Sequence, residues 1–131
     1  MKSIINNEIQ ALENTASVRD KWMRPEDFAG LLFVEDVTCD GATAHLKIRG
    51  RDCLTFDVTV EAASCDAMSF GREDYDGDSG VYESGYVVTI DAGDPEGIEA
   101  ECTFRTLRDV LFFIDKHTCP EGYVNTELYV W

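Results

Sequence analysis

Apolar and polar residues alternate with a period of two over most of the chain after residue 30. Between Leu54 and Glu61, for example, every second residue is apolar and the residues between are mainly polar. Such alternation is typical of an antiparallel strand with one buried face. The pattern predicts strands over residues 31–38, 42–49, 54–61, 81–91, 98–104 and 123–131. Short turns between them, such as Asp40-Gly41, indicate a meander.

Two segments show helical spacing instead. Near the N-terminus, Ser3 is placed to cap a helix. The apolar stripe of that helix consists of Ile5, Ile9, Leu12 and Ala16. Further along, Thr106 and Asp109 are close to a capping box at the start of a helix over residues 106–117. Pro25 is suited to the first position of one short helical turn.

These elements predict one α+β domain over residues 1–131. We expect a single antiparallel sheet of about five to six strands, mostly a meander, with the N-terminal helix and the helix over 106–117 packed on one face. The polar face is left to solvent or to a partner. Residues 62–80 lose the alternation and are rich in Ser, Asp and Gly, which predicts a long loop.

Charge changes this picture of an ordinary small domain. The 131 residues include 26 Asp and Glu but only 11 Lys and Arg, so the net charge is −15. Solubility alone requires a net charge of roughly 2–8 in magnitude. The excess argues against direct binding to nucleic acid or to an anionic membrane. No apolar run approaches the ~20 residues of a membrane span, and the polar start of the chain does not resemble a secretory signal.

The acidic excess is concentrated between Arg72 and Arg105, where no Lys or Arg occurs. In the predicted strands, four acids of this window (Glu83, Asp91, Glu99 and Glu101) point to the polar face, beside Asp57 and Glu61. Like charges opposite each other on a sheet cost a few tenths to about 1 kcal/mol per pair, so the clustering opposes folding. A cationic partner would supply the missing counter-charge. The predicted partner-binding residues are Asp57, Glu61, Glu73, Asp74, Asp76, Asp78, Glu83, Asp91, Glu99 and Glu101. The competing interpretation is an acidic surface that only keeps the protein soluble.

Cysteines and candidate metal ligands point to no cofactor. The five cysteines form no C-x-x-C pair, and their odd number predicts free thiols in a reducing, cytoplasmic setting. His117 and Cys119 could supply two zinc ligands, but no second pair is visible. Asp alternates over residues 74–78 as in the first half of an EF-hand. However, Ser79 and Gly85 stand where that loop needs Gly and a bidentate Glu. A calcium site of another type is left open.

The sequence contains no nucleophile elbow, P-loop, dinucleotide-binding or H-E-x-x-H motif. His45 lies on the polar face of a predicted strand and His117 near a helix end, and neither has a recognisable nucleophile beside it. We therefore do not expect an enzyme.

The leading hypothesis is a non-enzymatic inhibitor or decoy. Its carboxylates would occupy a positively charged surface of a nucleic-acid-binding protein or complex. In size and charge the chain is similar to small acidic anti-defence proteins of phages and mobile elements, including anti-CRISPR proteins and DNA mimics, although this similarity is one of composition. The alternatives are a bacterial accessory or immunity-type protein with one specific protein partner, and a small ligand-binding domain or enzyme that uses the cleft between sheet and helix. A monomer and a homodimer are both compatible with the sequence.

Overall fold

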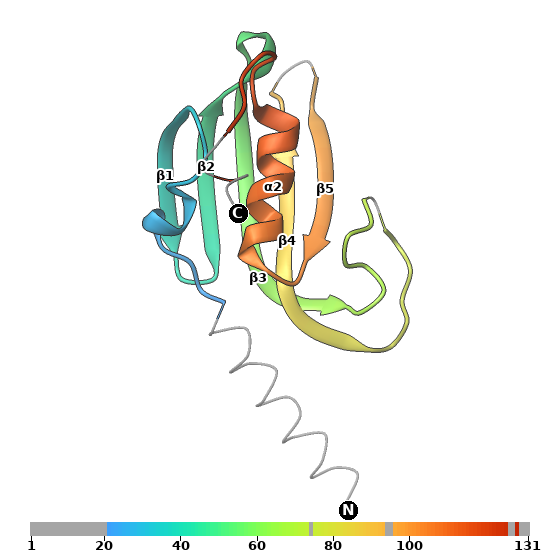
Figure 1. Cartoon of the computed structure of the whole chain (residues 1–131). Coiled ribbons are helices and arrows are strands. Elements are labelled where there is room, and N and C mark those ends of the chain that lie inside the picture. Colours follow the sequence, from blue (N-terminus) through green and yellow to red (C-terminus); the bar gives the residue numbers. More distant parts are fainter. Residues whose placement is uncertain (1–20, 74, 94–95, 126–127, 129–131) are drawn as a thin grey trace, which may run out of the picture.

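The computed structural model describes residues 21–131 except 74, 94–95, 126–127 and 129–131. Its elements are η1 (Pro25–Phe28), β1 (Val34–Asp40), β2 (Thr43–Arg49), η2 (Arg51–Cys53), β3 (Thr55–Asp66), β4 (Tyr82–Asp91), β5 (Ile98–Phe104) and α2 (Leu107–Thr118). The strands pair in sequence order as one open antiparallel sheet (Figure 1). The predicted α+β class, the meander and the helix after the fifth strand are confirmed. The predicted N-terminal helix lies outside the described residues.

One face of the sheet carries the core. Helix α2 lies across β4 and β5, and the segment around η1 lies against β1 (Figure 1). The largest side chains buried between these layers come from alternate strand positions and from the inner side of α2. They include Leu46, Ile48, Phe56, Val58, Val60, Val88, Ile90, Val110 and Ile114. The alternation read from the sequence therefore sorts each strand into a core side and an outer side.

Local sequence explains where α2 begins and how closely its end approaches the sheet. The Thr106 side chain accepts a hydrogen bond from the backbone N–H of Asp109 at 3.2 Å, which confirms the predicted cap. At the other end of α2, the backbone of Thr118 lies against Gly50. A Cβ on Gly50 would overlap the Thr118 carbonyl oxygen and come within 2.9 Å of the Phe56 ring. Glycine is thus required where the chain leaves β2.

The predicted loop over residues 62–80 begins later than expected. Strand β3 continues to Asp66, and its end pairs with the start of β4 from Ala62 opposite Tyr86 to Asp66 opposite Tyr82. The side chains of this segment no longer alternate regularly, because even-numbered positions are buried up to Ala62, whereas Ser64 is exposed and Cys65 is buried. Backbone pairing with β4 nevertheless keeps the segment extended. The loop proper starts at residue 67.

The predicted strand over 123–131 is wrong for the residues that the structure describes. Residues 123–125 and 128 belong to no strand. Instead, the Asn125 side chain is buried, with 1% of its surface exposed. Its amide donates to the Gly30 carbonyl oxygen at 2.8 Å and to Asp115 Oδ1 at 3.2 Å. These partners lie on α2 and on the segment after η1. The two hydrogen bonds therefore hold the segment around Asn125 on the face of the sheet that α2 covers, and not along a sheet edge.

Candidate functional site

The face of the sheet opposite α2 is the first candidate site, and we call it the open face. Its side chains are exposed or half-buried, and none of the described elements packs across it. Alternation and strand register place on it Asp36, Thr38, Asp40, Thr43, His45, Lys47, Arg49, Thr55, Asp57, Thr59, Glu61, Val87, Thr89, Asp91, Glu101 and Thr103. The face is therefore polar, with threonines between charged residues.

A row of charges crosses four strands of the open face. Lys47 lies opposite Asp36 on one side and opposite Asp57 on the other. Asp57 in turn lies opposite Asp91. Side chains directly opposite on neighbouring strands have Cβ atoms about 4.5–5.5 Å apart. Lys47 thus stands between two carboxylates, whereas the Asp57 and Asp91 pair brings like charges together.

Negative charge prevails on this face. It carries six carboxylates, those of Asp36, Asp40, Asp57, Glu61, Asp91 and Glu101, against two cations, Lys47 and Arg49, and Arg49 is already paired with Glu35. None of the six forms an ion pair within the described part of the chain. Four of them belong to the predicted partner-binding set. Asp36 and Asp40 precede the acidic window and were not predicted. Their place on the open face follows from the pairing of β1 with β2, in which they lie opposite Lys47 and Thr43.

Three predicted acids are instead held by the protein's own basic groups. Glu83 accepts a hydrogen bond from Arg105 at 3.0 Å. Glu73 lies 3.1 Å from His117 Nε2. Glu99 is bound by Arg51. Since each pair is partly or largely exposed, it contributes at most about 1 kcal/mol to stability, but its carboxylate already has a counter-charge. Glu83 and Glu99 were predicted to lie on the polar face beside Asp57, and each is paired with an arginine of the protein itself.

Glu99 leaves the predicted arrangement because β5 has an irregularity. The register shifts so that Ile90 lies opposite Ala100 while Asp91 lies opposite Ile98, which leaves Glu99 as the extra residue. Arg51, its partner, also donates to the carbonyl oxygen of His117 at 3.0 Å and lies 5.4 Å from the Phe56 ring centroid. Glu99 thus helps to join η2 to the end of α2.

The described acids of the 67–81 loop lie outside the paired strands that form the open face. Asp76 is exposed, and Asp78 accepts hydrogen bonds from the Gly80 N–H at 2.9 Å and the Tyr82 hydroxyl at 2.6 Å. The bond to Asp78 raises the pKa of Tyr82. The predicted residue Asp74 lies outside the described residues. No group of three or more His, Cys, Asp or Glu side chains within the described residues is arranged to hold a metal ion.

Asp66, the last residue of β3, accepts hydrogen bonds from residues near both ends of this loop. Its carboxylate accepts hydrogen bonds from the Ser79 hydroxyl and the Met68 N–H, both at 2.8 Å, and from the Ser79 N–H. Desolvation raises the pKa of Asp66, but the hydrogen bonds from Ser79 and Met68 outweigh it and bring the pKa below its ordinary value.

A shallow hollow of about 400 Å³ lies on the open face over β1, β2 and β3. Asp36, Thr38, His45, Lys47, Asp57 and Thr59 contribute to its lining. His45 lies opposite Thr38 and Thr59, yet its ring makes no hydrogen bond with another described residue. Carboxylates, hydroxyls and one ammonium group around a shallow, solvent-open depression suit the docking of polar or cationic side chains.

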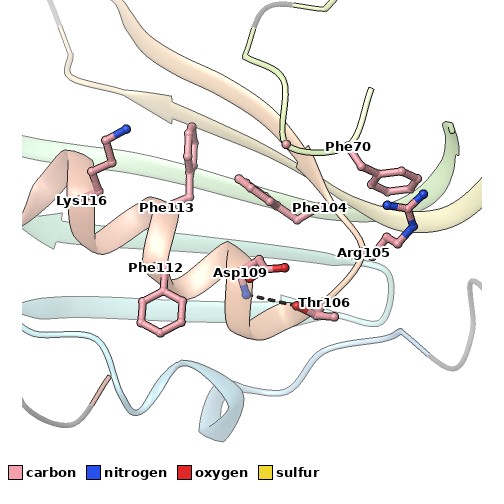
Figure 2. A pocket seen from close by; sticks show the side chains of 9 residues that line it. Phe70, Phe104, Arg105, Thr106, Asp109, Phe112, Phe113 and Lys116 are labelled. Atoms are coloured by element: carbon pink, nitrogen blue, oxygen red, sulfur yellow. Dashed lines mark hydrogen bonds between the residues drawn. The ribbon is translucent and has the colours of Figure 1, made fainter. Parts of the chain in front are cut away.

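The second candidate site is a groove of about 660 Å³ on the helix side. It runs between α2, the end of β5 and residues 70–71. In Figure 2, Phe113 and Lys116 extend from α2 on the side where Phe104 and Phe70 lie, and Phe112 projects from the other side of the helix. Arg105, at the start of the helix, lies 4.2 Å from the Phe70 ring centroid. The groove is thus an aromatic surface with cations at its ends.

None of the five cysteines, all within the described residues, forms a disulfide, as the sequence predicts. Burial is the main reason that the pKa of the Cys65 thiol is raised to about 11, and Glu61 adds to it. A thiol with so high a pKa carries almost no thiolate at neutral pH and is unreactive.

Comparisons with known protein families, with curated protein sequences and with solved structures find no match to this chain. In the described part of the chain, the one α-helix has 12 residues, and no helix there has the length and apolar character to span a bilayer.

Proposed function

We propose that this protein is a non-enzymatic inhibitor or decoy that docks its open face onto a positively charged surface of a nucleic-acid-binding protein or complex. The observation that supports the proposal most directly is the set of six carboxylates on that face. They outnumber its two cations, Lys47 and Arg49, and have no ion-pair partner among the described residues. The described ion pairs of the protein involve other acids.

Physical chemistry favours this class of partner. Proteins that bind nucleic acid concentrate Lys and Arg to neutralise phosphates, and an acidic surface is attracted to the same residues over a distance of about a Debye length. Strands in a sheet lie about 4.7–4.9 Å apart, so the carboxylates are held on a regular, preformed framework. A preformed surface loses little conformational entropy on binding.

The test uses two variants with the same change in net charge. The face variant carries Asp57→Lys, Glu61→Lys and Glu101→Lys. The matched control carries Glu26→Lys, Glu96→Lys and Glu121→Lys, at exposed acidic positions outside the open face. Wild type and both variants are immobilised, incubated with cell extract, and eluted with excess duplex DNA, with structured RNA or with salt, and the eluted proteins are identified by mass spectrometry.

We expect wild type and control to retain the same nucleic-acid-binding protein or complex, and DNA or RNA to displace it. The face variant should retain at least about tenfold less, because three attractive charges become repulsive. Equal retention by the face variant would contradict a role for the open face. A specific partner that nucleic acid does not displace would instead support the alternative, an accessory or immunity-type protein.

A further inference from the structure

Trp22 is an exposed aromatic residue on a fixed segment of backbone. It is 52% exposed, although both of its neighbours are held in place. Lys21 Nζ donates to the carbonyl oxygen of Arg105 at 2.6 Å, and Met23 is buried. The Met23 N–H also donates to the Gly41 carbonyl oxygen at 3.0 Å, so the chain passes beside the turn between β1 and β2 (Figure 1). A partner that binds Trp22 therefore meets a side chain whose backbone is already ordered.

The indole ring of Trp22 packs against the backbone of this turn. A Cβ on Gly41 would lie 3.2 Å from Trp22 Cε3 and 3.4 Å from Cδ2 and Cζ3. Gly41 also has φ +56°, a conformation that favours glycine. Glycine at this position therefore allows both the turn and the packing of the ring.

The same turn joins two residues of the open face. Asp40 and Thr43 are paired on either side of it, and Thr43 lies opposite Glu61 on β3. Asp40 and Glu61 belong to the six carboxylates that have no ion-pair partner among the described residues. Trp22 therefore lies next to an acidic end of the open face.

Other aromatic rings of the protein have a cation from the chain itself. A Lys or Arg lies 4.2–5.9 Å from the ring centroids of Phe56, Phe70, Tyr75, Tyr86 and Phe112. Among the described residues, no Lys or Arg lies over the ring of Trp22 in this way. Tryptophan is the side chain whose ring attracts a cation most strongly. The exposed ring and the unpaired carboxylates beside it are thus both suited to a cation from outside the protein.

We propose that Trp22 and Asp40 form a subsite at the end of the open face that binds an arginine side chain of the cationic partner. This inference rests on the proposed function. A guanidinium group is planar, so it can stack on the indole while its N–H groups donate to the Asp40 carboxylate, whereas the ammonium group of lysine is a compact and strongly hydrated charge. An exposed cation–π contact increases affinity by about two- to fivefold. The partner should therefore present arginine, and not lysine, at this position.

The experiment measures by fluorescence anisotropy, at low salt, how tightly the full chain binds two labelled peptides. One peptide alternates Arg and Ser, and the other, of equal length, alternates Lys and Ser. The test variant is Trp22→Leu, which keeps an apolar side chain beside Gly41 but has no ring. Trp22→Phe is the conservative variant. Tyr123→Leu is the matched control, since it removes an exposed ring beyond the end of α2.

We expect wild type and the Tyr123→Leu control to bind the Arg peptide about two- to fivefold more tightly than the Lys peptide. Trp22→Phe should keep part of this preference. Trp22→Leu should lose it, with an unchanged affinity for the Lys peptide. Urea unfolding shows whether each variant is folded. Should Trp22→Leu fail to fold, a reduced preference in Trp22→Phe is the expected result, and an undiminished one would contradict the inference.

Equal binding of the two peptides by wild type, or a preference for the Arg peptide that Trp22→Leu retains, would overturn the arginine subsite and leave the proposed function intact. The face variant with Asp57→Lys, Glu61→Lys and Glu101→Lys separates the two claims. It should bind both peptides at least about tenfold less tightly than wild type. If wild type bound neither peptide, or if the face variant bound both as tightly as wild type, the proposed function would fail and the subsite with it.

Discussion

The pair of Asp57 and Asp91 offers a direct test of whether the acidic face opposes folding. The two residues lie directly opposite on β3 and β4. Two unit charges about 6 Å apart in water repel by about 0.7 kcal/mol, within the 0.2–1 kcal/mol found for cross-strand pairs. Asp91→Asn removes this repulsion and leaves Asp57 with Lys47. It also keeps the oxygen that accepts the Gly93 N–H at 2.8 Å, so we expect the free energy of unfolding to rise by about 0.5–1 kcal/mol.

Urea unfolding at low salt measures this gain, and a thermal scan should show Tm rising by roughly 1–4 °C. Glu101→Gln is the matched control, since it removes one charge from the same face but lies opposite Thr89. The gain should exceed that of the control and largely vanish in 1 M salt, where the Debye length is about 3 Å. A gain no larger than that of Glu101→Gln, or one unchanged in 1 M salt, would refute the reasoning.

Two further predictions concern the segments that the structure ties down by side-chain hydrogen bonds. Asn125→Ala should lower the free energy of unfolding by about 2–3 kcal/mol in urea titration, because the carbonyl of Gly30 and the carboxylate of Asp115 lose a buried donor; a loss below about 0.5 kcal/mol would contradict this. The pKa of Asp66 is lowered in the folded state, so its contribution to stability is present above its unfolded pKa of about 3.9 and is lost as the pH falls through the folded value. Asp66→Asn should therefore destabilise the protein at pH 6, and the difference from wild type should shrink towards pH 3; a difference independent of pH would argue against the hydrogen bonds from Ser79 as its cause.

Four of the six carboxylates on the open face could be predicted from the sequence. Alternation placed Asp57, Glu61, Asp91 and Glu101 on the polar face, and the structure brings them together there. The prediction failed for Glu99, because an irregularity in one strand changes the partner of every later residue. Alternation within β5 carries no signal of such a shift against β4.

The sequence by itself determined the local order: the alternating strands, the Asp40-Gly41 turn with Gly41 at φ +56°, and the start of α2 at Thr106. These features depend on neighbours a few residues away, whose spacing can be read directly. Only the tertiary structure decided which charges meet and where the segment around Asn125 lies. Arg51 and Glu99 are 48 residues apart, and Asn125 and Gly30 are 95 apart. Such contacts arise only when the packing of α2 against the sheet brings distant segments together, and nothing in the spacing of either segment specifies its partner.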